Sequence, residues 1–251
     1  MYGSEREREI IKLLEENTYA TVEYLAKKIH ISPSSVRRDL KRLEAQGLIL
    51  RSYGGAEIKE SVNRKIPFYL RSHQNTQEKQ SVAKCAASLV KPGDVIFLDC
   101  STSTYFMLEY LKSIKDITIV TNSLASATAC AEFNINSFLA GGKLSQENRS
   151  CFVGMHTEEM VKSFHADYCF FSVQSLTREG ILYDCFESEI SLRRQMMNNS
   201  EHSVFLCDHS KINRFSAYRL CDMSEIDYVI SDIKAEDYLD KQYENVSFIN
   251  V

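Results

Sequence analysis

The sequence has no apolar run that approaches the roughly 18 residues needed by a membrane-spanning helix. Its N-terminus is charged from Glu5 onward and lacks the basic and then apolar layout of a secretory signal peptide. Internal repeats and low-complexity tracts are absent as well. These absences argue against membrane and exported proteins and predict a cytoplasmic globular chain with no membrane partner.

Paired cysteines are also absent, although the chain has eight cysteines. None stands in a Cys-x-x-Cys pair, the spacing that zinc sites and redox motifs commonly use. A disulfide framework is not expected in a chain without an export signal. We therefore expect no metal and no cofactor, and we interpret the cysteines as small apolar core residues. They are Cys85, Cys100, Cys130, Cys151, Cys169, Cys185, Cys207 and Cys221.

Charge is distributed unevenly along the 251 residues. Residues 1–66 contain 13 Lys and Arg against 10 Asp and Glu, whereas the remainder contains 17 against 24. A mildly basic front followed by an acidic remainder suggests two domains with different tasks. The predicted divisions are a first domain at 1–58, a polar linker at 59–76 and a second domain at 77–251.

The first domain is predicted to contain three short amphipathic helices. Thr21 and Ser32 are expected to cap the second and third helices, and Pro33 suits a first helical position. The turn between these helices, residues 30–32, is short, which is typical of a helix-turn-helix. Residues 48–58 follow as a strand, a Gly-Gly turn and a second strand, the pattern of a wing. The apolar stripes are Ile10, Leu13 and Leu14; Val22, Leu25 and Ile29; and Val36, Leu40 and Leu43.

The outer face of the third helix carries hydroxyl and basic side chains. Small hydroxyls at the start of such a helix can approach base edges in the major groove, and arginines reach guanine or phosphate. Wing residues would contact adjacent phosphates. The predicted DNA-binding residues are Ser32, Ser34, Ser35, Arg37, Arg38, Lys41, Arg42, Arg51 and Tyr53. Asp39 would repel phosphate, so we expect it to pair with a neighbouring arginine. The alternative interpretation is that this basic helix face is only solvated and binds no DNA. The helix cap, the short turn and the Gly-Gly hairpin together argue against that alternative.

From about Glu78, short apolar strands alternate with amphipathic helices, which predicts an open parallel α/β sheet. The predicted strands are Val95–Leu98, Ile117–Thr121, Ser137–Ala140, Tyr168–Val173, Ser203–Cys207 and Tyr228–Ser231. The predicted helices are 79–90, 103–113, 123–132, 157–164 and 187–199.

Polar loops follow several of these strands. The hydroxyl-rich loop 99–104 opens onto a helix, where free backbone N–H groups and the helix dipole favour an anion. Further polar signals at 121–122, 141–143 and 208–211 also follow strands, and the ends of parallel strands gather at one ligand-binding edge. Each signal alone could be only a cap or a turn. The predicted effector-binding residues are Asp99, Ser101, Thr102, Thr104, Asn122, Gly141, Gly142 and Lys211.

The motifs in both domains resemble those of DeoR-type bacterial regulators. The first domain matches through residues 31–40, then Leu43, Gly47, 50–51 and 54–56. The resemblance implies a repressor, typically of sugar-utilisation operons, that binds double-stranded operator DNA as a homo-oligomer. It further implies release by a small phosphorylated sugar. The second domain matches through the loop 99–104, Thr121-Asn122, Gly141-Gly142, Gly154, Asp167, Glu187 and Lys211.

The second domain of this family is similar to ribose-phosphate isomerases and CoA transferases. By this resemblance Ser101, Thr102 and Thr104 would hold the phosphate. The sugar end would be lined by Asn122, Gly141, Gly142 and Lys211.

Three departures from the family pattern open alternatives. Tyr53 replaces a usual histidine, and Ser35-Val36 replaces Thr-Ile. Ser172 stands where the family usually has glycine, which keeps open a regulator whose sensor pocket has decayed. A second alternative is an isomerase-class enzyme with a DNA-binding appendage. The isomerases carry a close pair of carboxylates after the position of Asp167, and this chain has no second carboxylate there. We therefore expect no enzyme and no catalytic residues.

Overall fold

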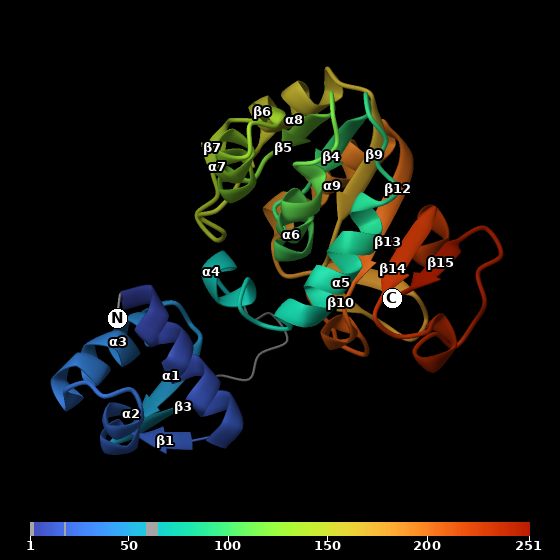
Figure 1. Ribbon diagram of the computed structural model, residues 1–251. Coiled ribbons are helices and arrows are strands. Elements are labelled where there is room, and N and C mark those ends of the chain that lie inside the picture. The colour runs from blue at the N-terminus through green and yellow to red at the C-terminus, as the bar shows by residue number, and fades with distance from the viewer. Residues whose placement is uncertain (1–2, 18, 59–64) are drawn as a thin grey trace. The chain divides into compact units, whose positions relative to one another are not determined.

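The computed structural model describes residues 3–17, 19–58 and 65–251. The chain forms two compact units, Met1–His73 and Gln74–Val251 (Figure 1). The first is a small helical unit with a three-stranded sheet, and the second is built on a seven-stranded sheet. The predicted fold class, a winged helix-turn-helix followed by an open α/β domain, is confirmed.

The N-terminal unit has the predicted winged helix-turn-helix. Thr21 caps α2 by accepting from the Tyr24 N–H at 3.1 Å. Ser32 caps α3 by accepting from the Ser35 N–H at 3.2 Å, and Pro33 is the first residue of that helix. The strands are antiparallel in the order β1-β3-β2, and β1 was not predicted because three residues show no clear period. The elements are α1 (Gly3–Asn17), β1 (Tyr19–Thr21), α2 (Val22–Lys28), α3 (Pro33–Ala45), β2 (Ile49–Ser52) and β3 (Gly55–Ile58).

The segment after the wing packs with the N-terminal core. Leu70, on the short helix α4 (Phe68–Arg71), is buried in that core, and Ile66 and Tyr69 pack against it. Residues 65–73 therefore differ from the polar linker that composition suggested, because three apolar side chains find a core to join. Residues 59–64 of the predicted linker lie outside the described part of the chain.

The C-terminal unit is centred on seven parallel strands in the order β15-β14-β12-β9-β4-β5-β6. Its inner strands are buried on both faces, as continuous apolar runs require. All six predicted strands are present, while the edge strand β15 was not predicted. The strands are β4 (Val95–Leu98), β5 (Thr118–Thr121), β6 (Asn136–Leu139), β9 (Ala166–Phe171), β12 (Ser200–Cys207), β14 (Tyr228–Ser231) and β15 (Ser247–Asn250).

Helices cover both faces of this sheet (Figure 1). One core lies beneath α5 (Thr76–Ala87), α6 (Thr102–Leu111) and α7 (Leu124–Glu132). The other lies beneath α8 (Met155–Lys162) and α9 (Glu187–Asn198). Short strands pair outside the main sheet: β7 (Lys143–Leu144) with β8 (Phe152–Val153), and β10 (Ser175–Leu176) with β11 (Ile181–Asp184) and β13 (Tyr218–Asp222). Three 3-10 turns, His209–Lys211, Met223–Glu225 and Ala235–Asp237, complete these elements.

The strand order reverses beside β4. From β4 the chain adds β5 and β6 on one side, and it then returns to place β9, β12, β14 and β15 on the other. The loops after β4 and β9 therefore diverge at the carboxyl edge, which is where open α/β sheets bind ligands. The predicted loop 99–104 lies at this position.

Candidate DNA-binding surface and effector site

The start of α3 presents hydroxyl side chains at the surface. The Ser32 Oγ lies 2.9 Å from the hydroxyls of both Ser34 and Ser35. Ser32 and Ser34 are exposed, and Ser35 is half-buried. A capped and therefore ordered first turn with exposed hydroxyls suits the approach to base edges in a major groove.

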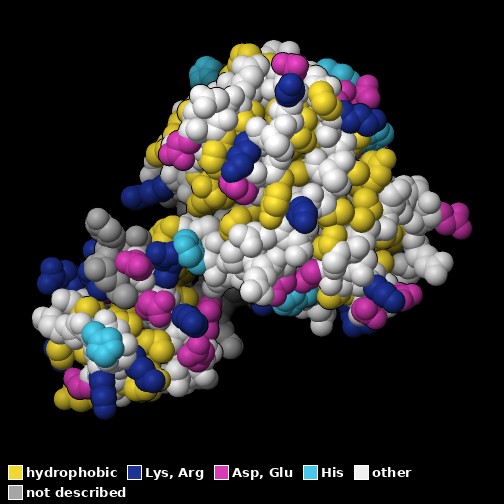
Figure 2. Space-filling view, in the orientation of Figure 1, with side chains coloured by type: hydrophobic (Ala, Val, Ile, Leu, Met, Phe, Trp, Pro, Cys, Tyr) yellow, Lys and Arg dark blue, Asp and Glu magenta, His cyan; other side chains and the backbone are white. Residues whose placement is uncertain are grey.

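Three predicted DNA-binding cations lie on the exposed side of α3. These residues are Arg37, Arg38 and Lys41. Arg37 lies 3.5 Å from Glu23, with 58% and 68% of the two side chains exposed. An ion pair so exposed contributes little and can be exchanged for phosphate or a base. On the face drawn in Figure 2, Lys and Arg side chains project from the N-terminal unit among Asp and Glu.

Arg42 has a different environment, although half of its side chain is exposed. It contacts the fully buried Asp39, which also accepts from Arg6 at 2.8 Å. Arg42 lies 2.8 Å from Glu7 as well, and Glu7 accepts from the Tyr69 hydroxyl at 2.6 Å. Burial and the bond to Glu7 raise the pKa of Tyr69. The expected pairing of Asp39 with a neighbouring arginine is confirmed, and Arg42 joins α3 to α1.

The wing is a tight hairpin between β2 and β3. Gly54 adopts a φ of +82°, a conformation that favours glycine, and a Cβ at Gly55 would lie 2.4 Å from a backbone oxygen of β1. Tyr53 at the tip is fully exposed. Arg51 lies 3.4 Å from Glu44 at the end of α3. Both predicted wing residues are thus at the surface of the N-terminal unit.

In the C-terminal unit, Asp99 organises the loop that follows β4. Its Oδ1 accepts from the Ser101 backbone N–H and from the Thr104 hydroxyl, each at 3.0 Å. Ser101 caps α6 by accepting from the Thr104 N–H at 3.3 Å. The Thr104 hydroxyl therefore supports the loop from inside. Thr102 is in the first helical turn, whose backbone N–H groups lack intrahelical partners and attract anions.

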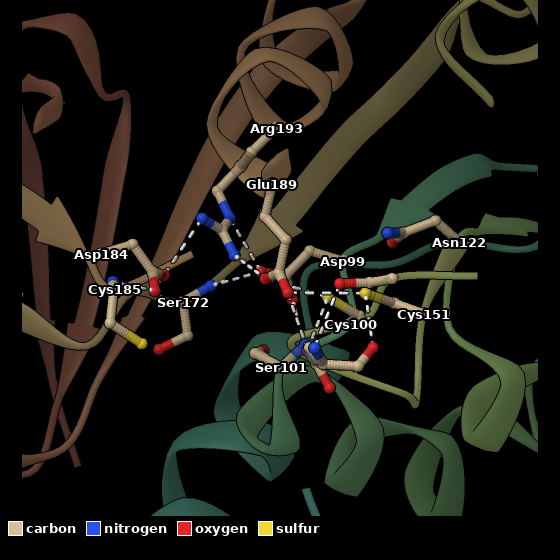
Figure 3. A network of polar contacts seen from close by, with 12 residues as sticks. Asp99, Cys100, Ser101, Asn122, Cys151, Ser172, Asp184, Cys185, Glu189 and Arg193 are labelled. Carbon is tan, nitrogen blue, oxygen red and sulfur yellow. Dashed lines mark hydrogen bonds and ion pairs between the residues drawn. The ribbon is translucent and has the colours of Figure 1, made fainter. Parts of the chain in front are cut away.

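A buried arginine on α9 holds this loop from the other side. Arg193 donates to Asp99 at 3.0 Å, to Asp184 at 3.2 Å and to Glu189 at 3.4 Å (Figure 3). Only 3% of its side chain is exposed. Burial alone would lower the pKa of Arg193, but the three carboxylates outweigh it and raise the pKa. The guanidinium stays charged and offsets the charge of Asp99 at a loop predicted to receive an anion.

Ser172 follows β9 and also contacts the loop. Its backbone N–H donates to Asp99 Oδ2 at 3.2 Å, and its hydroxyl donates to the Leu206 carbonyl oxygen at 2.6 Å. The hydroxyl of this unusual serine is thus bound to the neighbouring strand β12.

The carboxylate of Glu189 also accepts hydrogen bonds from two thiols and one amide. Cys100 donates to Glu189 Oε2 at 3.2 Å, and Cys151 donates to Oε1 at 3.4 Å. Asn148 Nδ2 donates to the same Oε1 at 2.7 Å. The hydrogen bond with Cys151, burial and nearby carboxylates raise the pKa of Cys100 well above its usual value. Cys100 is therefore a protonated thiol in this arrangement.

Asn122 and the glycines follow β5 and β6. Asn122 donates to the Phe152 carbonyl oxygen at 3.0 Å, while its buried Oδ1 has no partner among the described residues. The Gly141 carbonyl oxygen accepts from the Thr157 hydroxyl at 3.0 Å. A Cβ at Gly142 would lie 2.4 Å from that hydroxyl oxygen, so a side chain there would displace Thr157.

Lys211 lies in the turn after β12, 3.5 Å from the buried Asp208. Burial would raise the pKa of Asp208, but Lys211, Ser210 and Lys79 together lower it. Lys79, on α5, is itself buried and donates to the Gln74 carbonyl oxygen at 2.7 Å. Two lysines therefore act on one carboxylate at the carboxyl edge of the sheet.

Several residues that shape this site were not predicted. Sequence spacing offers no signal for their contacts, because these residues come from α5, from the loop after β4, from the connection before β8 and from α9, which are far apart in sequence. They are Lys79, Cys100, Asn148, Cys151, Glu189 and Arg193.

Comparisons with protein families match nearly the whole chain. Residues 6–62 match the DeoR-like helix-turn-helix domain, and residues 74–233 match the DeoR C terminal sensor domain.

Three curated relatives show how widely the likeness extends. The HTH-type transcriptional repressor GlcR of Bacillus subtilis is 33% identical over 92% of this chain and 89% of that protein. The glycerol-3-phosphate regulon repressor of Escherichia coli is 30% identical over 92% of both chains. The L-fucose operon activator of Haemophilus influenzae is 30% identical over 98% of both chains. All three are named as regulators of transcription.

Among solved structures, ribose 5-phosphate isomerase A from Methanocaldococcus jannaschii is similar over 55% of both chains, with 17% identity and a TM-score of 0.42. A likeness this weak says nothing about activity. Within the described residues, every helix is too short or too polar to cross a membrane.

Proposed function

Because the chain belongs to the DeoR family of transcriptional regulators, we propose that it represses a sugar-utilisation operon and leaves its operator when a phosphorylated sugar binds. The observation that supports this most directly is the pairing of an exposed, capped recognition helix with a hydroxyl-rich loop at the sheet's switch point. One part suits DNA, and the other suits a small anion. The protein would work in the cytoplasm, where both are found.

On the DNA side, the proposed contacts divide into two kinds. Ser34, Ser35 and Arg37 at the start of α3 would read base edges. Arg38, Lys41, Arg51 and Tyr53 would position the domain on phosphates. Ser32 would serve mainly as the cap, and Arg42 as the link between α3 and α1, because their polar atoms are already bonded.

On the effector side, the first turn of α6 would receive the phosphate. The backbone N–H groups near Thr102 and the Ser101 hydroxyl supply donors, and Lys211 supplies a positive charge. Asn122 would accept from a sugar hydroxyl through its Oδ1. Gly141 and Gly142 would allow the close approach of the sugar to the backbone.

The contacts favour regulation over isomerase chemistry. Asp167 accepts from the Val95 N–H at 2.8 Å, at the start of β4 and so at the sheet edge opposite the loop. Asp99, Asp184 and Glu189 all accept hydrogen bonds from Arg193, so each carboxylate is already engaged within the protein. A general base needs a carboxylate within reach of substrate.

The alternative of a decayed sensor pocket rested on Ser172. It is weakened because the Ser172 hydroxyl donates to a backbone oxygen of the sheet.

We further propose that the C-terminal unit assembles a homo-oligomer that presents recognition helices in pairs to a repeated operator. The effector would favour an arrangement in which those helices no longer match the half-sites.

The decisive experiment measures fluorescence anisotropy of a duplex taken from upstream of this chain's own reading frame, with and without a panel of sugar phosphates. Binding that one sugar phosphate weakens is the expected result. Lys211→Gln should reduce the response to that sugar phosphate without changing operator affinity, whereas the exposed Lys234→Gln should behave as the parent. Operator binding that no sugar phosphate changes would contradict the proposed effector class. A reporter gene that the protein activates would contradict repression.

A further inference from the structure

Cys100, Cys151 and Glu189 converge from three separate parts of the C-terminal unit. Cys100 follows β4, Cys151 precedes β8, and Glu189 lies in the first turn of α9. Their ligand-type atoms all lie within 4.8 Å of one another, and all three residues are buried. Figure 3 shows both sulfur atoms directed toward the same carboxylate.

The distances match those of a tetrahedral metal site. Cys100 Sγ lies 3.2 Å from one carboxylate oxygen of Glu189, and Cys151 Sγ lies 3.4 Å from the other. With zinc–sulfur bonds near 2.3 Å and zinc–oxygen bonds near 2.0 Å, tetrahedral angles place sulfur and oxygen about 3.5 Å apart. Each sulfur now lies near a different carboxylate oxygen, so one cation bound to both sulfurs would require the Glu189 carboxylate to turn or to bind through both oxygens.

The surroundings supply further oxygen and nitrogen atoms. Asn148 Nδ2 lies 2.7 Å from Glu189 and 3.8 Å from Cys100 Sγ. Asn122 is 2% exposed, and its Oδ1 has no hydrogen-bond partner among the described residues. The backbone oxygen of Asn122 accepts from the N–H of Phe152, the neighbour of Cys151.

The local charge also accommodates a cation. One guanidinium, that of Arg193, is shared by Asp99, Asp184 and Glu189, so negative charge is in excess. A divalent cation that displaces the two thiol protons leaves the net charge of the cluster unchanged. Such binding adds no net charge to this buried cluster. The cation also supplies the counter-charge that a buried thiolate needs.

We propose that Cys100, Cys151 and Glu189 bind one thiophilic divalent cation of the zinc class. Two sulfur ligands select such a metal over magnesium or calcium, which prefer oxygen. Because Cys100 lies between Asp99 and Ser101, the cation would bind the effector loop to α9 and to the segment before β8. The site goes beyond the proposed function and does not depend on the identity of the effector.

The first test titrates the reduced, full-length protein with Co²⁺ under anaerobic conditions. We expect one equivalent to produce a thiolate-to-cobalt charge-transfer band and visible bands of a tetrahedral ion, and Zn²⁺ to displace it. Cys151→Ala and Cys100→Ala should each lose about half of the charge-transfer intensity and bind Co²⁺ at least tenfold more weakly. Cys130→Ala, which removes a fully buried cysteine on α7 outside the cluster, should match the parent.

Charge transfer that survives in both cluster variants, or that Cys130→Ala abolishes, would overturn the proposal. A parent protein that binds no Co²⁺, or whose Cys100 and Cys151 form a disulfide under reducing conditions, would do the same.

A second measurement needs no variant and so does not depend on the variants' folding. X-ray absorption of the parent protein loaded with one equivalent of Zn²⁺ should show two sulfur scatterers near 2.3 Å and lighter atoms near 2.0 Å. Four sulfur ligands would assign the metal to other cysteines, and no sulfur ligands would assign it to the surface; each result refutes the proposed site.

Discussion

The two units use arginine in opposite ways. On α3, Arg37 is 58% exposed and has one weak partner, Glu23, which is itself exposed. On α9, Arg193 is 3% exposed and is bound by three carboxylates. The first cation is free to exchange its partner for DNA, whereas the second cannot leave without stranding buried charge. Exposure therefore separates a cation that we propose to bind DNA from one that builds the interior of its unit.

The largest effect that tests this comparison is expected from Arg193→Met. The change leaves Asp99, Asp184 and Glu189 buried without their shared counter-charge. A cost of about 3–5 kcal/mol should lower the Tm of the C-terminal unit by about 10 °C. Calorimetry of the full chain measures this, with Arg178→Ala as the control because its pair with Asp240 is exposed. Equal melting of the two variants would break the comparison.

The next effect concerns Arg37→Ala. Loss of a base contact should weaken operator binding by about 1–3 kcal/mol and relax specificity at one base pair. Stability should change by less than about 0.5 kcal/mol, since the side chain is exposed. Anisotropy and thermal melting report the two quantities. Lys12→Ala removes the same charge from the exposed surface of α1 and should leave base specificity intact.

Arg42→Ala sharpens the comparison inside the N-terminal unit. Asp39 and Glu7 would lose a partner, so the unit should lose about 1–2 kcal/mol of stability. At temperatures where the variant is folded, its operator specificity should match the parent's. Urea denaturation measures the stability and anisotropy measures the operator specificity of the same sample. An altered base preference with unchanged stability would indicate that Arg42 contacts DNA.

The smallest expected effect is the pH dependence of His209. Its hydrogen bond to Asp232, 2.6 Å from Nδ1, raises its pKa above the usual value near 6.5. The raised pKa means that the pair stabilises the fold fully below about pH 6.5 and that this contribution is lost as the pH rises through the folded pKa. Because the ring is half exposed, the effect should stay below about 1 kcal/mol. His209→Asn should flatten the dependence of the free energy of unfolding on pH in this range. An unchanged dependence would show that the pair of His209 and Asp232 does not contribute to it.

Local features of the site were predictable because they depend on neighbours in sequence. The caps at Thr21 and Ser32, the apolar stripe of α3 and the loop after β4 follow from spacing and side-chain chemistry within a few residues. Leu70 shows the limit, because its burial depends on a core built by residues that lie 14 to 60 positions earlier, from Ile10 to Ala56.

By itself, the sequence determined the order of the two domains, the recognition helix and the strand-end loop that suits an anion. Helix periods, caps and strand runs record which side faces water, and that information is local. Only the tertiary structure decided that Arg42 is tied to Asp39 and Glu7 while Arg37 stays available. It also decided that Arg193, Glu189, Cys100 and Cys151 meet beneath one loop. The packing of α9 across the sheet creates that cluster, and no spacing along the chain encodes a contact between residues 89 positions apart.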